Sequence, residues 1–328
     1  MTGLDLHAVG HAADTLFAAD ASHGLTLALV VMQRGEVVFE RYGHQPDTAF
    51  GPGGPVTADT TLVSWSMAKS ITHAAVGVLV GEGRLQLDAP APVAGWAGTP
   101  KERITLQHLL DMMPGLEFVE DYVDAGISHC IEMLYGSGQH DMAAYAAALP
   151  LVHEPGTVWN YSSGTTNIVA RIVGDVVGGG RAGMEAFLSE RIFGPSGMHS
   201  AIPKFDEVGT FVGSSFVYAT ARDFARFGEL YRLDGVGADG TRVLPAGWTD
   251  HARTQVATDP ESGFGYGAHW WLWPQFPGSL ACHGYEGQYT LVVPDRELVV
   301  VHLGKCPADV RPQVNEVLAD IVTAASLA

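Results

Sequence analysis

The stretch Ser64-Trp65-Ser66-Met67-Ala68-Lys69 begins a run of small and apolar residues that ends at Gly81. A run of this composition and length predicts a buried helix over 66–81. Ser66 and Lys69 are three residues apart, so they share one helix face and the lysine amine can reach the serine hydroxyl. A lysine whose pKa is lowered by burial can take the serine proton and turn the hydroxyl into a nucleophile. A solvated lysine beside a capping serine fits the same four residues, so the motif alone leaves both interpretations open.

A second stretch, Trp159-Asn160-Tyr161-Ser162-Ser163-Gly164, follows a Pro-Gly turn signal and precedes a predicted helix. The phenol of Tyr161 can relay a proton at this position. The alternative is that the tyrosine ring packs among helices while Ser162 or Ser163 caps the next helix.

A third stretch, Cys282-His283-Gly284-Tyr285-Glu286-Gly287-Gln288, is expected to enter a strand. Its glycines would let the strand backbone approach a ligand and offer an N–H group to an oxyanion. The alternative is a glycine-marked bulge in an edge strand, with His283 satisfied in the core.

The rest of the chain predicts an α+β fold. Two β-rich runs, 25–32 and 37–42, are separated by four polar residues and predict an antiparallel hairpin. Apolar spacing and Gly or Pro punctuation predict the remaining elements. These are strands near 266–272, 288–293 and 298–303, and helices over 4–19, 106–113, 141–149, 164–177, 184–192, 221–233 and 310–325. We expect an antiparallel sheet domain flanked by the terminal helices (1–60 and 211–328), an inserted all-helical domain (61–210), and an active site in the cleft between them.

Composition excludes several classes of protein. The chain has 328 residues, 47% of them hydrophobic, which is enough for a sizeable core. Its formal charge of −18 disfavours binding to nucleic acid and to anionic lipid, and no apolar stretch approaches the length of a membrane span. The N-terminus has no basic region followed by an apolar one, so we expect a cytoplasmic protein. Three cysteines without C-x-x-C spacing predict neither a disulfide framework nor a zinc site.

Taken together and in this order, the three stretches resemble the penicillin-recognising serine hydrolases of the class C β-lactamase, D-aminopeptidase and DD-peptidase type. Within that family the chain looks most like the 6-aminohexanoate-dimer (nylon-oligomer) hydrolases and the β-lactamase-fold carboxylesterases. The resemblance runs from about residue 25 to residue 305. It rests on Ser66-Met67-Ala68-Lys69-Ser70, Ile104-Thr105-Leu106-Gln107-His108-Leu109-Leu110-Asp111-Met112, Glu120-Asp121-Tyr122-Val123-Asp124, Tyr161-Ser162-Ser163-Gly164 and Tyr218-Ala219-Thr220-Ala221-Arg222-Asp223.

The resemblance implies a β-lactamase/transpeptidase-like fold and a role for each of four residues. Ser66 would attack the carbonyl carbon, and Lys69 would act with Tyr161 as the general base. Tyr161 would then pass the proton to the leaving group. The backbone N–H groups of Ser66 and Tyr285 would hold the oxyanion, with the second donor open within residues 283–286. Water would hydrolyse the acyl-enzyme, so the family chemistry requires no metal and no organic cofactor.

Departures from the family pattern bear on the substrate. Penicillin-binding members carry Lys-Thr-Gly or His-Thr-Gly where this chain has Cys282-His283-Gly284 or His283-Gly284-Tyr285, so a substrate carboxylate loses its usual lysine partner. They also often carry Tyr-x-Asn where this chain has Tyr161-Ser162-Ser163. Tyr122 resembles the lid tyrosine of the nylon-oligomer branch, which hydrogen-bonds the substrate amide nitrogen. That branch also binds the substrate ammonium group through an aspartate after the loop histidine, whereas His129 here is followed by Cys130.

His283, Gly284 and Tyr122 are therefore predicted to contact the substrate. Trp271, with its neighbours Trp270 and Trp273, is predicted to wall an acyl pocket, although aromatic residues in a sheet are also typical of a core.

These observations predict a cytoplasmic serine hydrolase that cleaves a small ester or a linear amide through an acyl-Ser66 intermediate. Three alternatives stay open: a 6-aminohexanoate-dimer amidase proper, a β-lactamase or penicillin-binding enzyme, and a catalytically silent ligand receptor. We expect no nucleic-acid or membrane partner. The oligomeric state is open, with a homodimer as one candidate.

Overall fold

The computed structural model describes residues 3–18, 24–47, 51–122 and 128–326, and its largest feature is an eight-stranded sheet. The strand order is β2-β1-β13-β12-β11-β10-β9-β8, with every neighbouring pair antiparallel. The strands are β1 (Leu25–Gln33), β2 (Glu36–Tyr42), β8 (Ala257–Thr258), β9 (Gly265–Tyr266), β10 (Trp271–Leu272), β11 (Leu280–Gly284), β12 (Gln288–Val293) and β13 (Leu298–Lys305). Two smaller sheets pair β3 (His44–Gln45) with β4 (Gly54–Pro55), and β7 (Val217–Ala219) with β5 (Leu62–Val63) and β6 (Ile202–Pro203).

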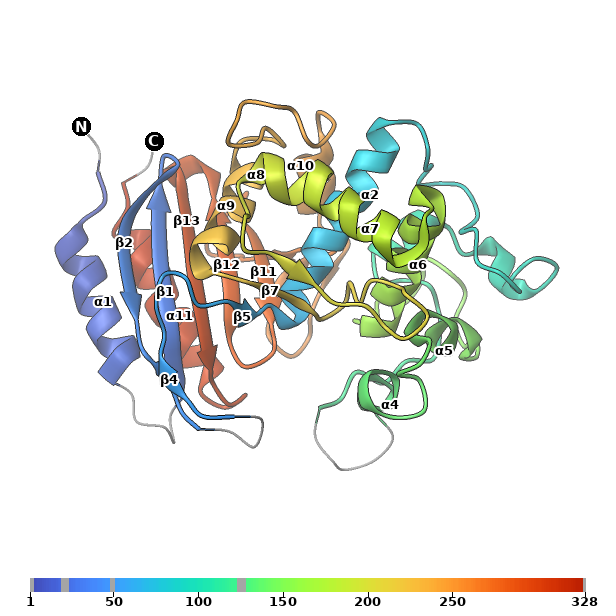
Figure 1. The fold of residues 1–328 in the computed structure, drawn as a ribbon, viewed down its shortest axis with the longest axis horizontal. Coiled ribbons are helices and arrows are strands. Elements are labelled where there is room, and N and C mark those ends of the chain that lie inside the picture. Colours follow the sequence, from blue (N-terminus) through green and yellow to red (C-terminus); the bar gives the residue numbers. More distant parts are fainter. Residues whose placement is uncertain (1–2, 19–23, 48–50, 123–127, 327–328) are drawn as a thin grey trace.

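Most helices lie on the side of the molecule away from the sheet edge formed by β2, where α4, α5, α6 and α7 gather (Figure 1). The helices are α1 (Leu6–Ala18), α2 (Ala68–Gly81), α3 (Leu106–Leu110), α4 (His129–Tyr135), α5 (Met142–Ala148), α6 (Ser163–Val177), α7 (Gly180–Leu188), α8 (Gly194–Ser196), α9 (Ala221–Arg232), α10 (Trp248–Arg253) and α11 (Arg311–Thr323). Short 3-10 turns are η1 (Trp65–Met67), η2 (Pro100–Arg103) and η4 (Pro294–Arg296), and η3 (Ser189–Phe193) is a π-helical turn.

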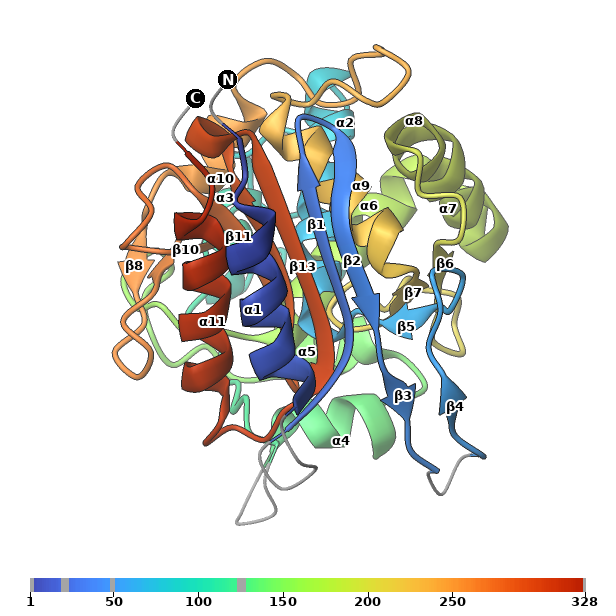
Figure 2. The same cartoon turned by 90° about the vertical axis from the view of Figure 1, so that its left-hand side faces the viewer.

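The large sheet separates two hydrophobic cores, because successive residues of a strand point to opposite faces. In β1, Leu29 and Val31 belong to the core under α1 and α11, whereas Val30 and Met32 belong to the core shared with the other helices. Figure 2 shows α1 and α11 side by side across that first face of the sheet. The nearly continuous apolar sequence of β1 is explained by this burial on both faces.

Helix α2 runs through the second core and is buried along its length, from Ala68 to Leu79. Its small residues permit this position. At Gly77 an added Cβ would lie 2.4 Å from the Trp248 indole nitrogen, so only glycine leaves room for that ring. The helix that follows Ser66 is therefore held inside the core.

The predicted α+β class is confirmed, with three local corrections. The expected strand over 266–272 is two short strands, β9 and β10, because His269 adopts a positive φ of 58° that turns the chain between them. The strand expected over 288–293 is confirmed as β12, but the stretch that leads into it also contains the end of β11, a strand that was not expected. Helix α4 was not expected. Residues 123–127 lie outside the described residues, and they include Val123 and Asp124 of the stretch in which Tyr122 resembles a lid tyrosine.

The domain boundaries proposed near residues 60 and 210 stay a prediction. Among the described residues, no helix is both long enough and apolar enough to cross a membrane.

Candidate active site

Ser66 lies in the turn η1, immediately before α2, and this turn is held in a strained conformation. Trp65 has a positive φ of 43°, which is unusual for a residue with a large side chain. The turn is fixed by Ser64, whose hydroxyl lies 3.2 Å from the carbonyl of Ser215 and accepts the N–H of Val217 at 3.1 Å. These contacts fix the backbone of η1, and with it the position of Ser66, against the segment that contains β7.

Lys69 is 2% exposed, and its amine touches three oxygen atoms behind Ser66. Its Nζ lies 2.9 Å from Ser66 Oγ, 2.9 Å from Ser163 Oγ and 3.0 Å from the carbonyl oxygen of Ser214. Burial lowers the pKa of Lys69, and the charge of Glu120 acts in the opposite direction. The spacing predicted from sequence is confirmed, and the lysine is buried, contrary to the solvated alternative.

The hydrogen-bond partners of Lys69 fit a neutral amine, which has two N–H donors and one lone pair. The Ser214 carbonyl can only accept a hydrogen bond. Ser163 Oγ donates its proton to Glu120 Oε1 at 2.6 Å, so it also accepts from Lys69. In this structure Lys69 Nζ is placed to donate to all three oxygen atoms. When the amine is neutral, its two N–H groups serve the Ser214 carbonyl and Ser163 Oγ, and its lone pair is left for the Ser66 hydroxyl, as a general base requires.

Glu120 and Ser163 form a link to Lys69 that sequence reasoning missed. Glu120 accepts the backbone N–H of Ser163 at 2.7 Å and a hydrogen bond from the hydroxyl of Tyr122 as well as that of Ser163. The sequence offered Ser162 or Ser163 as the cap of the next helix and no other role for Ser163. The cap of α6 is Ser162, which accepts the N–H of Thr165. The position of Ser163, two residues after Tyr161 and on the first turn of a helix, is the signal that could have revealed it.

Tyr161 stands beside Ser66 as a protonated phenol. Its ring centroid lies 4.8 Å from Lys69 Nζ, and the rings of Trp271 and Tyr266 lie 5.4 and 5.9 Å away. Burial, followed by the charge of Glu120, raises the pKa of Tyr161, while its hydrogen bond to Ser66 acts to lower it. A phenol that stays protonated can donate a proton to a leaving group, whereas Lys69 is the better first acceptor.

His283, Gly284 and Tyr285, at the end of β11, lie against the turn η1, which contains Ser66. A Cβ at Gly284 would lie 2.4 Å from the backbone oxygen of Ser64, so this close approach requires glycine. The pairing of β11 with β12 continues without a shift to Gly284, and β11 is an interior strand, so the edge-strand bulge is wrong. The ring of Tyr285 packs 5.9 Å from that of Trp65 and 4.9 Å from that of Tyr122.

His283 is a neutral ring whose tautomer is fixed by its partner. The Trp273 indole donates to His283 Nε2 at 2.8 Å, and since an indole nitrogen can only donate, the imidazole proton resides on Nδ1. Burial, followed by the charge of Arg311, lowers the pKa of His283 to about 3. The ring stacks on Trp271 at 5.1 Å. His283 is therefore a neutral imidazole in the stretch where the resemblance leads us to expect Lys-Thr-Gly or His-Thr-Gly.

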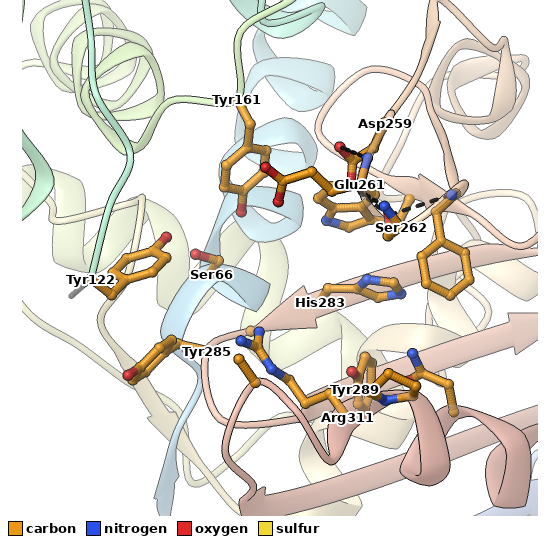
Figure 3. Close-up of a pocket in the computed structure, with 16 residues that line it drawn as sticks. Ser66, Tyr122, Tyr161, Asp259, Glu261, Ser262, His283, Tyr285, Tyr289 and Arg311 are labelled. Atoms are coloured by element: carbon orange, nitrogen blue, oxygen red, sulfur yellow. Dashed lines mark hydrogen bonds between the residues drawn. The ribbon is translucent and has the colours of Figure 1, made fainter.

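The predicted site residues converge on one cavity of about 390 Å³, which we call the polar cavity (Figure 3). Seven of the eight line it, and the eighth, Lys69, is buried behind Ser66. Figure 3 shows Tyr122 and Tyr285 on one side of Ser66 and His283 on the other. Trp271 contacts the cavity, whereas Trp270 and Trp273 are 0% and 1% exposed and belong to the core.

The polar cavity also contains charged residues that the sequence did not single out. Asp259 and Glu261 line it from the loop between β8 and β9, and Arg311 lines it from the start of α11. Asp259 already accepts hydrogen bonds from the backbone and hydroxyl of Ser262. The cavity thus suits a polar group of a small molecule.

Glu120→Gln should move the acidic limb of the pH profile of kcat/KM to lower pH by about one unit. The charge of Glu120 raises the pKa of Lys69, so its removal lowers that pKa further. Because catalysis needs neutral Lys69, activity is lost as the pH falls through this pKa, and the loss then occurs at a lower pH. Ester hydrolysis measured over a series of buffers tests the shift.

The matched control for this experiment is Glu132→Gln, which removes an exposed carboxylate from α4 without touching Lys69. Its profile should coincide with that of the parent enzyme. An unchanged acidic limb in a well-folded Glu120→Gln variant would show that this charge does not act on Lys69.

Comparison with known proteins agrees with this fold. A family profile described as Beta-lactamase matches residues 13–322. The 6-aminohexanoate-dimer hydrolase of Paenarthrobacter ureafaciens is 28% identical over 309 residues, which cover 86% of this chain and 73% of that protein.

Two solved structures share the fold. A family VIII carboxylesterase is 17% identical with a TM-score of 0.73, covering 97% of both chains. A penicillin-binding protein homologue from Caulobacter crescentus is 18% identical with a TM-score of 0.73, covering 99% of both chains. Both likenesses concern the architecture.

Proposed function

The chain belongs to the β-lactamase family of serine hydrolases, and we propose that it hydrolyses small esters through an acyl-Ser66 intermediate. The observation that carries this proposal is the contact between Lys69 Nζ and Ser66 Oγ at 2.9 Å, in a site where burial lowers the pKa of the lysine. A lysine whose pKa is lowered gives up its proton more readily, and the neutral amine is a competent base for a serine hydroxyl.

The proposed acylation uses groups of four residues of this chain. Ser66 Oγ forms a bond to the substrate carbonyl carbon as Lys69 Nζ takes the hydroxyl proton. The backbone N–H groups of Ser66 and Tyr285 stabilise the negative charge that develops on the carbonyl oxygen. When the tetrahedral intermediate collapses, the bond to the leaving group breaks, Tyr161 donates its proton to that group, and Lys69 restores the proton to Tyr161.

Deacylation repeats these steps with water as the nucleophile. Water adds to the acyl carbon and loses a proton to the neutral base, and the bond to Ser66 Oγ breaks as the serine regains its proton. The products are a carboxylic acid and an alcohol, and water is the only reactant besides the ester.

Linear amides are a second candidate class of substrate, because Tyr122 lines the same cavity as Ser66 and carries a hydroxyl. Tyr122 lines the polar cavity and donates its hydrogen bond to Glu120. An amine is a poorer leaving group than an alkoxide and needs more help from nearby donors and acceptors.

Tyr122→Phe should therefore lower kcat/KM by about tenfold for a linear amide, as expected for one lost hydrogen bond, and by less than about threefold for an ester. Steady-state rates on a matched amide and ester pair test this expectation. Tyr145→Phe on α5, outside the cavities that contain Ser66, is the control. Equal losses of kcat/KM on both substrates would show that Tyr122 acts only through packing.

Two other interpretations are less well supported by the residues. The lysine usual in penicillin recognition is absent from this stretch, and His283, which lines the cavity, carries no charge to replace it. A silent receptor has no need for Ser66, Lys69 and Tyr161 to touch one another. The cytoplasmic location and the oligomeric state stay predictions.

The proposed function is tested by offering the protein a short-chain p-nitrophenyl ester, the linear 6-aminohexanoate dimer and a chromogenic cephalosporin. We expect ester hydrolysis, and an acyl group on Ser66 when the reaction is quenched early and mapped by peptide mass spectrometry. An adduct on another residue, or no hydrolysis of any of the three compounds, would contradict the proposal.

A further inference from the structure

A second cavity, of about 220 Å³, opens on Ser66 and differs in character from the polar cavity. We call it the apolar cavity. Its lining is mainly apolar and aromatic and includes no charged side chain among the residues that the structure describes there: Trp65, Cys130, Ile131, Leu134, Tyr135 and Tyr285, together with Ser66, Tyr122, Ser163 and Ser215. Helix α4 supplies its far wall through Ile131, Leu134 and Tyr135.

The two cavities meet at the nucleophile. Ser66, Tyr122 and Tyr285 line both of them, so a carbonyl group held at Ser66 borders both cavities. Asp259, Glu261 and Arg311 line only the polar cavity. An ester or amide has two substituents that diverge from its carbonyl carbon, and the site offers each a different environment.

The position of Tyr161 decides which substituent enters which cavity. Tyr161 lines the polar cavity and does not line the apolar one. The group that receives a proton from Tyr161 must lie within hydrogen-bond reach of its hydroxyl, so the leaving group occupies the polar cavity. The acyl chain then extends away from Tyr161, past Ser66 and toward α4.

We propose that the apolar cavity is the acyl-chain pocket of this enzyme and that it selects short to medium uncharged alkanoyl groups. This inference rests on the proposed function, because it presupposes the acyl-Ser66 intermediate. It also reassigns Trp271, which sequence analysis placed in an acyl pocket, to the leaving-group side, since Trp271 lines the polar cavity with Tyr161.

The same pocket rejects a charged acyl chain. Transfer of an ammonium group from water into an apolar cavity without a partner is costly. Cys130 is 1% exposed and forms part of the lining, and burial raises the pKa of its thiol, so it offers no negative charge to a cation. A hexanoyl ester should therefore be preferred to the 6-aminohexanoyl ester of the same alcohol.

The primary test is a series of p-nitrophenyl esters from acetate to dodecanoate, with the alcohol held constant. While the pocket fills, kcat/KM should rise about fourfold per added methylene, as expected for burial of a CH₂ group. The rise should stop and reverse before dodecanoate. The p-nitrophenyl ester of 6-aminohexanoic acid should react at least about tenfold more slowly than the hexanoate.

Variants of α4 locate the effect. Ile131→Trp narrows the cavity from an exposed position and should shift the preferred chain to fewer carbons, whereas Leu134→Ala enlarges it and should shift the preference to more. Ile202→Trp, at an exposed site on β6 that lines neither cavity, is the matched control and should leave the series unchanged. If Ile131→Trp does not fold, Leu134→Ala alone decides the direction.

A second series keeps the acyl group constant and lengthens the alcohol. Neither α4 variant should alter this series, whereas Ala308→Trp, at an exposed residue that lines the polar cavity, should. The inference is overturned if the acyl series is flat, if the charged hexanoate analogue reacts as well as the neutral one, or if the α4 variants change the alcohol series instead. Absence of all Ser66-dependent hydrolysis would overturn the proposed function itself. The two failures are distinguishable, because each of the results above requires that some ester is hydrolysed.

Discussion

Ser66→Ala should abolish ester hydrolysis, with kcat reduced on the order of a million-fold. The variant has no oxygen to bond to the acyl carbon, so any residual rate reflects only substrate binding and stabilisation of the oxyanion. The readouts are p-nitrophenolate release and the absence of an acyl adduct in the intact mass. Because no other step of the proposed mechanism can replace the missing bond, this is the largest effect expected of any single substitution.

The fold should be unaffected by this change. Helix α2 begins without a side-chain cap, so the loss of Ser66 removes no capping hydrogen bond, contrary to what a serine at a helix start suggests. The loss of its contact with Lys69 should cost no more than about 1 kcal/mol. Circular dichroism and the melting temperature would verify this.

Ser70→Ala is the matched control for Ser66→Ala. Ser70 lies one turn further along α2, is 1% exposed and donates a hydrogen bond to the carbonyl of His269 at 2.8 Å. Its loss should cost about 1 kcal/mol of stability and leave turnover intact. Retained turnover in Ser66→Ala, with a normal melting temperature, would remove Ser66 from the mechanism.

Lys69→Ala should lower kcat by about a thousand-fold to ten-thousand-fold, the range expected for loss of a general base. The loss should persist at alkaline pH, because Tyr161, the remaining proton-transfer group beside Ser66, has a pKa raised by burial and does not become a base there. Steady-state rates from neutral to strongly alkaline pH provide the measurement. Full recovery of activity at high pH would show that hydroxide or another group suffices.

Lys69→Arg separates charge from basicity. Arginine keeps a positive charge at this position but cannot be deprotonated in a protein, so it should be as inactive as alanine if Lys69 acts as a base. Lys204→Ala is the control, because Lys204 lies over the ring of Tyr218 and lines neither cavity at Ser66. Substantial activity in Lys69→Arg would mean that the site needs a cation there and not a base.

Local patterns in the sequence were sufficient for much of the fold and for the reacting atoms. The three-residue spacing of Ser66 and Lys69 placed both on one helix face, and the helix confirms the contact. The apolar run of 25–32 predicted a strand, and the periodicity of 310–325 predicted a helix; both are present as β1 and α11. Such features depend on neighbours in the chain, so their signal is visible in a short window.

Tertiary structure decided the features whose partners are distant in the chain. Glu120 reaches Ser163 across forty-three positions and thereby Lys69, and no local pattern specifies that contact. The division of the strand expected over 266–272 into β9 and β10 also escaped prediction, because it depends on a turn at His269 whose N–H reaches the carbonyl of Leu110.

Residue type and helical spacing are properties of the chain, so Ser66, Lys69 and Tyr161 could be identified as candidate acyl-transfer groups without the fold. The two cavities at Ser66, an apolar one lined by α4 and η1 and a polar one lined by β11 and α11, could be recognised only in the folded chain. A cavity is the space left by side chains from separate elements, so its shape and polarity exist only after the long-range contacts have formed.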